Sequence, residues 1–363
     1  MKGSMGIKIL VAILVVLIAV AGILLGMKMM KNNEIEGNIQ TGKTNEDEGT
    51  TIVEVKEPKT FKGTDRPIAV MIDNHKGAMP QAGLNDAYMV YEIIVEGGES
   101  RLMALFKGSD LEKIGPVRSS RHYFLDYALE NDAIYVHFGW SPQAQSDITK
   151  LGVNNINGIY ESSKSFWRTK DKYAPHNVAT STEKILEIAE RKGYRTTSTQ
   201  ESVLNYVADE FDLKSDIDAT KITIPYSYSN VVEYEYDNVT KRYTRYSRDK
   251  KQVDWETGET VTTKNIIIVK CDNWTLNDGS GAGRQTIDNV KALKGYYITN
   301  GKAIEITAEK STRSSQTVYK DMQGNEIDVN DGNTFIQICP IDSKVEIEPG
   351  KPEVVETTNV INQ

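Results

Sequence analysis

The chain has 363 residues, 39% hydrophobic and 26% charged, which is enough for about two folded domains. Its formal net charge of −8 argues against a nucleic-acid partner, because nucleic-acid-binding domains usually carry a basic face. The two cysteines, Cys271 and Cys339, are too few for a disulfide scaffold or a cysteine-based zinc site.

The N-terminal segment predicts a membrane anchor. Residues 9–27, ILVAILVVLIAVAGILLGM, carry no charge and are long enough to cross a bilayer once as a helix. We therefore expect a single N-terminal transmembrane helix within residues 1–27, with the chain beyond residue 30 outside the cytoplasm. The alternative is a signal peptide cleaved after the A-x-A pattern at residues 19–21. Lipidation is excluded there, because Ile23 stands where a lipobox requires cysteine.

An α/β ectodomain is expected after a tether. Residues 28–64 are polar and predict a disordered tether, and residues 65–211 alternate between strand-like and helix-like patterns. The expected strands are PIAVMID, YMVYEIIV, RLMALFK and AIYVHF, with Gly97-Gly98 as a hairpin turn. Helices are expected at 119–132, capped by Ser119, at 141–152, capped by Ser141, and at 180–193, with Thr180 and Glu183 as a capping box.

A β-rich C-terminal domain is expected over residues 219–349, followed by a tail at 350–363. No convincing amphipathic helix interrupts its strand-like runs, which are VVEYEY, RYTRYSR, NIIIVK, KGYYIT, AIEIT, QTVYK and TFIQIC. Cys271 and Cys339 each end one of these runs. They could form a disulfide if the two strands are neighbours, but two buried free cysteines are the favoured interpretation.

The stretch IGPVRSSRHYF, residues 114–124, places two cations at a predicted helix start. Arg118 and Arg121 flank Ser119, although the free N–H groups of a helix start are already positive. A bound phosphate or carboxylate would offset these charges, and we therefore predict an anion site. The alternative is that the arginines pair with acidic residues of the same domain, such as Asp73, Glu92 or Glu96.

Other candidates follow from the rule that ligands bind beyond the carboxyl ends of the strands of an open α/β sheet. The predicted ligand-binding residues are Arg118, Ser119, Arg121, Asn74, Trp140, Arg168 and Asn177. Trp140 is interpreted either as a core residue or as a platform for sugar rings. The catalytic candidates are Asp73, His75, His137 and His176, one histidine serving as general base. No H-E-x-x-H is present, and we expect neither a metal nor a cofactor.

Several segments of the first domain form a dense pattern: RPIAVMIDNH, QAGLNDAYMVYE, EGGESRLMALF, KIGPVRSSRHYFLDYALENDAIYVHFGWSPQA and FWRTKDKYAPHN. This pattern resembles the YerB-like family of bacterial lipoproteins, and NIIIVK, GSGAGR and GNEIDVNDGNTFIQICP resemble its C-terminal module. The resemblance implies a two-domain protein on the outer side of the membrane and no particular activity. The chain departs from the family at Ile23 and at residues 306–310, ITAEK, where a tryptophan-lysine pair is expected.

The layout also resembles that of LytR-CpsA-Psr phosphotransferases, which attach anionic glycopolymers to the cell wall, but no motif is shared. We predict a membrane-anchored extracytoplasmic cell-envelope protein that binds an anionic or glycan component through the first domain. Its expected partners are the membrane and a cell-wall glycan or phosphate-bearing polymer. The alternatives are an envelope phosphotransferase or hydrolase, and a purely structural protein whose arginines are fully paired. A catalytic site would bring a histidine or carboxylate within about 4 Å of the arginines.

Overall fold

The computed structural model describes residues 56–350. The expected transmembrane helix, most of the tether and nearly all of the tail lie outside these residues. Within residues 56–350, no helix is long and apolar enough to cross a membrane. The helices of this part of the chain are α2 (Phe124–Glu130), α3 (Pro142–Lys150) and α4 (Thr182–Arg191), with 3-10 turns η1 (Lys76–Ala78), η2 (Glu96–Gly98) and η3 (Gly158–Tyr160). The described structure is therefore strand-rich, with few helices.

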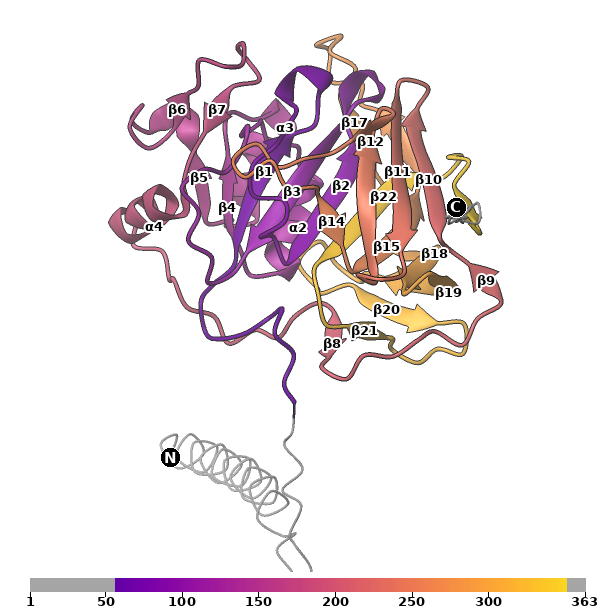
Figure 1. Ribbon diagram of the computed structural model, residues 1–363. Coiled ribbons are helices and arrows are strands. Elements are labelled where there is room, and N and C mark those ends of the chain that lie inside the picture. Colours follow the sequence, from indigo (N-terminus) through magenta and orange to yellow (C-terminus); the bar gives the residue numbers. More distant parts are fainter. Residues whose placement is uncertain (1–55, 351–363) are drawn as a thin grey trace, which may run out of the picture. The chain divides into compact units, whose positions relative to one another are not determined.

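One sheet of eleven strands runs through the described structure (Figure 1). Its order is β20 (Val318–Asp321), β19 (Lys302–Glu309), β18 (Ala292–Thr299), β15 (Asn265–Cys271), β22 (Thr334–Pro340), β2 (Met89–Ile94), β3 (Ser100–Phe106), β1 (Ile68–Asp73), β4 (Ile134–His137) and β5 (Asn155–Asn157), with β9 (Ile217–Asp218) against β19. The parallel pair β2–β22 joins the α/β part to the β-rich part. The two predicted domains therefore share one sheet.

A second sheet of six strands belongs to the C-terminal part. Its members are β13 (Lys250–Lys251), β12 (Arg242–Ser247), β11 (Asn230–Asp237), β10 (Lys221–Ser227) and β23 (Glu346–Glu348), with β14 (Thr262–Thr263) against β12. Three two-stranded sheets complete the fold: β16 (Asn273–Thr275) with β17 (Gln285–Ile287), β8 (Asn205–Val207) with β21 (Asp328–Asn330), and β6 (Trp167–Arg168) with β7 (Val178–Ala179).

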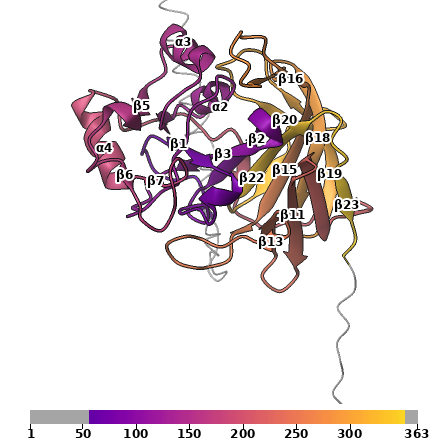
Figure 2. The same ribbon diagram turned by 90° about the horizontal axis from the view of Figure 1, so that it is seen from above.

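Both faces of the long sheet are buried. Alternate residues of β1 enter two different apolar clusters. Ile72 belongs to the cluster that also contains residues of α4 and the six-stranded sheet, and Met71 belongs to the cluster that also contains residues of α2 and α3. Figure 2 shows α2 and α3 on one side of the sheet and β11 and β13 on the other. This two-sided burial explains why the run IAVMID is apolar throughout instead of alternating with polar residues.

All of the expected strands and one of the three expected N-caps are present. The runs predicted as strands in both parts form β1–β4, β11, β12, β15, β18–β20 and β22. Gly97 and Gly98 form the turn between β2 and β3, both with positive φ. Helix α3 begins with Pro142, and the Oγ of Ser141 accepts from the backbone N–H of Ala144 at 3.3 Å, as predicted.

The cap of α4 was misassigned by one residue. Ser181 is the N-cap, since its Oγ accepts from the N–H of Lys184 at 3.3 Å. The hydroxyl of Thr180 donates instead to the carbonyl of Ser165 at 2.9 Å, which ties the start of α4 to the preceding loop.

The predicted helix start at Ser119 is wrong. Helix α2 begins at Phe124, and the segment before it runs beside β1, where the N–H of Arg118 donates to the carbonyl of Met71 at 2.9 Å. The Oγ of Ser119 donates to the carbonyl of Phe138 at 3.0 Å and caps no helix. Arg118 and Arg121 therefore do not lie at a helix N-terminus, and no helix dipole contributes to an anion site there.

The two cysteines are free although their strands are neighbours. In the parallel pair β15–β22, Cys339 lies opposite Lys270 and Cys271 lies opposite Pro340. This offset of one residue points the two thiols to opposite faces of the sheet, because side chains alternate along a strand. Each enters a different apolar cluster, and burial raises the pKa of both thiols to about 12.

Candidate functional site

The end of β1 and the start of β3 bring charged side chains together. The two strands are antiparallel, with Asp73 opposite Arg101. Because β3 is antiparallel to β1, it starts beside the end of β1, at Arg101, and ends beside the start of β1, at Phe106. The loop after β3 then runs back alongside β1 towards Asp73. There the N–H of Asp73 donates to the carbonyl of Pro116 at 2.8 Å. This return places Arg118 beside the end of β1.

Asp73 holds a histidine and an arginine on one carboxylate oxygen. The Nδ1 of His176 lies 2.7 Å from Oδ2 of Asp73, and the Nε of Arg118 lies 3.3 Å from the same oxygen. The side chain of Asp73 is only 5% exposed, whereas those of His176 and Arg118 are 19% and 25% exposed. Since an ionised carboxylate only accepts hydrogen bonds, Nδ1 of His176 carries a proton, and in the neutral ring Nε2 has the free lone pair.

His75 stacks on His176. The ring centroids are 4.3 Å apart and the planes differ by 10°. The Nδ1 of His75 accepts from the N–H of Gly77 at 3.1 Å, so the proton of the neutral ring is on Nε2. The stacked rings therefore have opposite tautomers, and one Nε2 is a donor while the other is an acceptor. A Cβ on Gly77 would lie 3.3 Å from atoms of both rings, which makes glycine the best fit there.

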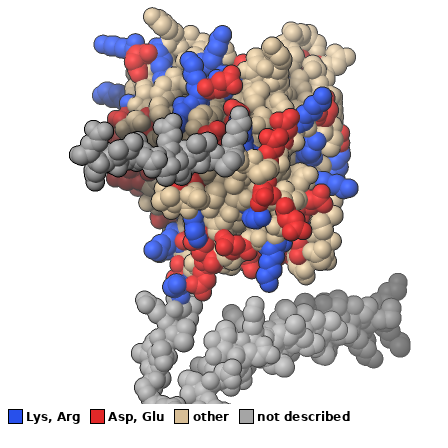
Figure 3. All heavy atoms as spheres, turned by 45° about the vertical axis from the view of Figure 1, so that its right-hand side comes forward, with Lys and Arg blue, Asp and Glu red and all other residues tan. Residues whose placement is uncertain are grey.

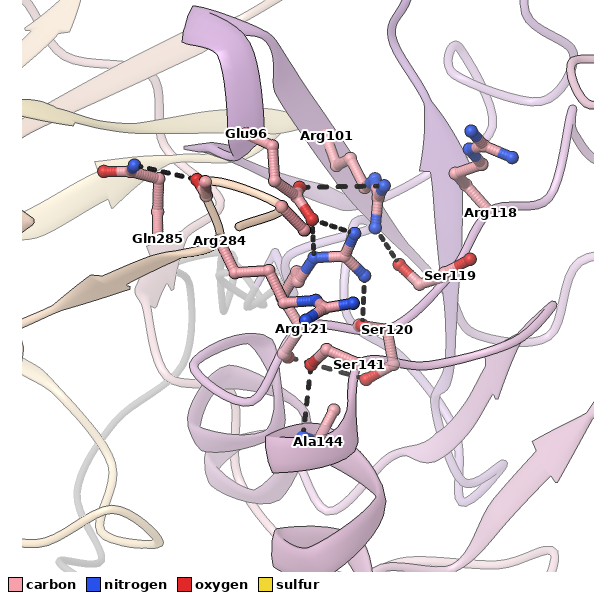
Figure 4. A network of polar contacts seen from close by, with 12 residues as sticks. Glu96, Arg101, Arg118, Ser119, Ser120, Arg121, Ser141, Ala144, Arg284 and Gln285 are labelled. Atoms are coloured by element: carbon pink, nitrogen blue, oxygen red, sulfur yellow. Dashed lines mark hydrogen bonds and ion pairs between the residues drawn. The ribbon is translucent and has the colours of Figure 1, made fainter. Parts of the chain in front are cut away.

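A second group of charges surrounds Glu96 (Figure 4). The Nε of Arg121 donates to Oε1 of Glu96 at 2.8 Å, its Nη2 contacts the same oxygen, and its Nη1 donates to the carbonyl of Ser120. Arg101 lies 4.0 Å from Oε2 of Glu96 and donates to the carbonyl of Ser119. Burial lowers the pKa of Arg101 to about 10, and the charge of Arg121 acts in the same direction.

Three guanidinium groups thus share two carboxylates. We call Asp73, Glu96, Arg101, Arg118 and Arg121 the arginine cluster. Its three arginines carry one more charge than its two carboxylates, so the net charge of the cluster is positive. Arg284, also drawn in Figure 4, pairs with Asp278 at 2.6 Å. On the face seen in Figure 3, positive and negative side chains are interspersed, so no broad basic field covers that face.

Burial and the neighbouring arginines have opposite effects on the pKa of Glu96. Its loss of solvent by itself would raise the pKa of the carboxyl, but the hydrogen bond and charge of Arg121, together with Arg101, hold the pKa below its ordinary value. Glu96 therefore remains ionised and keeps Arg121 occupied.

Several predicted residues support the site without facing a ligand. Asn74 is fully buried, and its Nδ2 donates to Glu92 at 3.0 Å and to Ser100 at 2.9 Å. The Nη1 of Arg168 donates to Oδ1 of Asn177 at 2.7 Å, and the amide of Asn177 closes the loop that carries His176. These contacts position the ends of the segments that hold Asp73 and His176.

His137 is not part of this group. It is fully buried, its Nδ1 pairs with the carbonyl of Gly139 at 2.8 Å, and its Nε2 pairs with Asn155 at 3.2 Å. Burial lowers its pKa to about 4. Trp140 lies next to it, with ring centroids 5.5 Å apart, at the edge of a separate cavity.

Two charged residues were missed or misassigned from the sequence. Arg101 was treated only as part of a strand, although a charge inside the apolar run RLMALF is a signal for a specific partner. Glu92 was named, with Asp73 and Glu96, as one possible partner of Arg118 or Arg121 in the alternative interpretation, and the arginines pair with the other two. The partner of Glu92 is Arg245, at 2.6 Å, with both side chains fully buried.

No group of three or more histidine, cysteine, aspartate or glutamate side chains within residues 56–350 could hold a metal ion.

Comparison with known proteins decides the family. Residues 53–195 match the family described as "Protein of unknown function (DUF3048) N-terminal domain", and residues 222–336 match its C-terminal domain. The "Putative lipoprotein YerB" of Bacillus subtilis (strain 168) is 32% identical over 318 residues, which is 83% of this chain and 91% of the relative. The chain belongs to the YerB-like family.

A solved YerB structure agrees with this membership. The crystal structure of YerB protein from Bacillus subtilis superposes with a TM-score of 0.70 at 32% identity, covering 78% of this chain and 94% of that chain. The YerB-like resemblance predicted from the sequence is confirmed. The family description assigns no activity, so a function for this member has to be argued from its own site.

Proposed function

We propose that this member of the YerB-like family is a membrane-anchored extracytoplasmic protein that binds a phosphate-bearing envelope polymer through Arg118 of the arginine cluster. Two observations support the location: the apolar run at residues 9–27 and the name of the relative, a "Putative lipoprotein". With Ile23 in place of a lipobox cysteine, the apolar run itself would be the anchor.

The observation that carries the binding proposal is the difference between Arg118 and Arg121. All three guanidinium nitrogens of Arg121 contact acceptors of the protein. Within residues 56–350, the side chain of Arg118 has a single polar partner, Asp73, reached through Nε. Its two Nη groups are therefore available, and a guanidinium fork matches two oxygens of a phosphate.

The test uses residues 56–363, which belong to one compact unit, titrated with inorganic phosphate and with polyglycerol phosphate by calorimetry. Arg118→Ala should weaken phosphate binding about tenfold or more, the effect of losing one charge-assisted hydrogen bond. Arg191→Ala is the matched control, since Arg191 is a surface arginine on α4 that also pairs with a carboxylate, Glu161. Equal binding by wild type and Arg118→Ala, or no binding by wild type, would contradict the proposal.

A second candidate, a phosphodiester hydrolase, is favoured by the pair Asp73–His176. The Asp73 carboxylate is within 4 Å of Arg118 and holds His176 by Nδ1, which is the arrangement expected of an oriented general base. Nε2 of His176 would take a proton from water, and the hydroxide would attack phosphorus. The P–O bond would then break, and the leaving oxygen would recover the proton from the imidazolium. Arg118 would stabilise the developing charge.

Hydrolysis of bis(p-nitrophenyl) phosphate tests this candidate. His176→Gln should abolish any activity of the wild-type protein, whereas His122→Gln, a histidine outside the site, should leave it unchanged. An inactive wild type that still binds phosphate would leave binding as the function. A His176→Gln variant with full activity would remove the general-base role.

A further inference from the structure

A cavity lined by aromatic and amide side chains lies beside the arginine segment. It has a volume of about 270 Å³, and its walls include Trp140, Gln145, Asn155, Asn157, Tyr160 and Lys192. Such a volume is at the lower limit of ligand pockets, which suits one ring better than a large ligand.

Two aromatic rings form one part of the wall. The ring centroids of Trp140 and Tyr160 are 5.8 Å apart, with the planes inclined by 52°. Trp140 rests on the buried ring of His137, whose two nitrogens are both hydrogen-bonded, so the indole has a firm support. Tyr160 is 71% exposed and its neighbour Ile159 is 53% exposed, an unusual position for two large apolar side chains side by side.

The amide of Asn157 provides an oriented donor. Oδ1 of Asn157 accepts from the N–H of Gly139 at 2.9 Å and from the N–H of Ile159 at 3.2 Å. These bonds fix which end of the amide is oxygen, and leave its Nδ2 group as the free end. Within residues 56–350, neither this Nδ2 nor the side-chain amide of Gln145 has a hydrogen-bond partner.

We infer that this cavity binds one pyranose ring of a glycan. The negative faces of the aromatic rings attract the weakly positive C–H groups of a sugar face, and the free amides can hydrogen-bond its hydroxyl oxygens. The lining is mostly uncharged, and its cation, Lys192, has a carboxylate neighbour, Glu161, at 3.7 Å. A neutral sugar therefore fits this cavity better than an anion does.

The segment that contains Arg118 and Arg121 lies directly beside the segment that contains Trp140, so the cavity is close to the arginine cluster. Ser120 and Trp140 form a β-bridge, and the N–H of Phe138 donates to the carbonyl of Arg118 at 3.0 Å. A polymer that contains both sugar and phosphate could contact both. Sugar binding by the cavity does not depend on the proposed phosphate site, and each can be tested without the other.

The folded protein is titrated with N-acetylglucosamine, with the trimer of N-acetylglucosamine and with glucose. Binding is measured by ligand-observed NMR and by calorimetry. One ring with about 15 heavy atoms should bind with a Kd on the order of 1 mM. Tyr160→Ala should weaken sugar binding at least tenfold and leave phosphate binding unchanged. Arg118→Ala should weaken phosphate binding and leave sugar binding unchanged. Tyr173→Ala, which removes a tyrosine that is 89% exposed outside the cavity, should change neither.

Because Tyr160 is exposed, its removal should not unfold the protein, and an unchanged melting temperature would show this. The inference would be overturned if none of the three sugars bound at concentrations well above a millimolar. It would also be overturned if Tyr160→Ala bound them as wild type does. Phosphate binding that persists in either case would show that the sugar cavity, not the phosphate site, had failed.

Discussion

Arg118 and Arg121 are three residues apart and have different environments. Arg121 is 8% exposed and forks onto Glu96, whereas Arg118 is partly exposed and touches Asp73 through one nitrogen. Arg121 therefore has a structural task, and Arg118 is the arginine of this segment with capacity for a ligand.

This difference predicts unequal effects on stability. Arg121→Ala should lower the free energy of unfolding by about 2–3 kcal/mol, because Glu96 would keep its charge with only Arg101 nearby. Arg118→Ala should cost less than about 1 kcal/mol, since Asp73 keeps its bond to His176. Urea denaturation of the two variants measures both values. Equal losses would mean that Arg118 is structural as well.

The fully buried ion pair Glu92–Arg245 predicts a larger loss of stability when one partner is removed. Burial alone would lower the pKa of Arg245, but the carboxylate of Glu92 outweighs it and raises the pKa above its ordinary value. Arg245→Ala should destabilise the protein by about 3–5 kcal/mol, because it leaves an unpaired charge in the core. The double variant Glu92→Leu/Arg245→Met should lose less than Arg245→Ala alone. A double variant that is less stable than the single one would show that the pair itself contributes net stability.

His122 predicts a pH dependence. Burial lowers its pKa from 6.5 to about 4 in the folded protein, while the carboxylate of Asp147 partly opposes this shift. Between these values the unfolded chain binds more protons, so stability falls as the pH falls from about 6.5 towards 4. His122→Gln lacks this titrating group. Its free energy of unfolding relative to that of the wild type should therefore be about 1–2 kcal/mol higher at pH 5 than at pH 7. Urea melts of both proteins at the two pH values give the difference, and an unchanged difference would contradict the prediction.

At the scale of elements, the cap of α4 can be tested directly. Ser181→Ala should lower the free energy of unfolding by about 1 kcal/mol, because the N–H of Lys184 loses its acceptor. Ser181→Gly should cost only about a few tenths of a kcal/mol, since glycine tolerates the cap conformation and lets water reach the helix end. Thermal melts compare the two variants. A larger loss for glycine than for alanine would mean that the Ser181 hydroxyl is not the cap.

Local patterns predicted the elements whose signals are local. Pro142 and Ser141 specify the start of α3 within one turn, and the apolar runs of β1 and β3 are long and unbroken. The start of α2 could not be predicted in this way. Residues before it are held by hydrogen bonds to Met71 and Gly139, which are partners distant in sequence, and these override the local preference of Ser119 for a cap.

The candidate site was predicted only in part, because some of its residues follow local patterns and others depend on contacts distant in sequence. Asp73, His75 and Arg118 were named because they follow apolar runs, and the structure does bring them together with His176. Their pairing depends on β3 being antiparallel to β1, which no local pattern reports. Arg101 was missed because its role depends on that register.

At the scale of the molecule, the shared sheet predicts how the chain tolerates truncation. Residues 56–211 include β2 but not β22, so the edge of β2 from Met89 to Ile93 would lose its parallel partner. An exposed apolar edge strand promotes aggregation. We expect this fragment to be insoluble or to lack a cooperative thermal transition, whereas residues 56–363 should show one. A soluble fragment 56–211 with a sharp transition would show that the α/β part folds alone.

The β2–β22 pair also determines when the fold can be completed. Met89 pairs with Thr334, about 245 residues later in the chain. Contacts so distant in sequence slow folding, because a large loop must close before they form. During synthesis the first part of the chain is complete while one side of its sheet is still open, and that side stays open until β22, almost the last described strand, is made. In that interval the open edge is available for pairing with other chains, so the incomplete fold is the state most prone to aggregation.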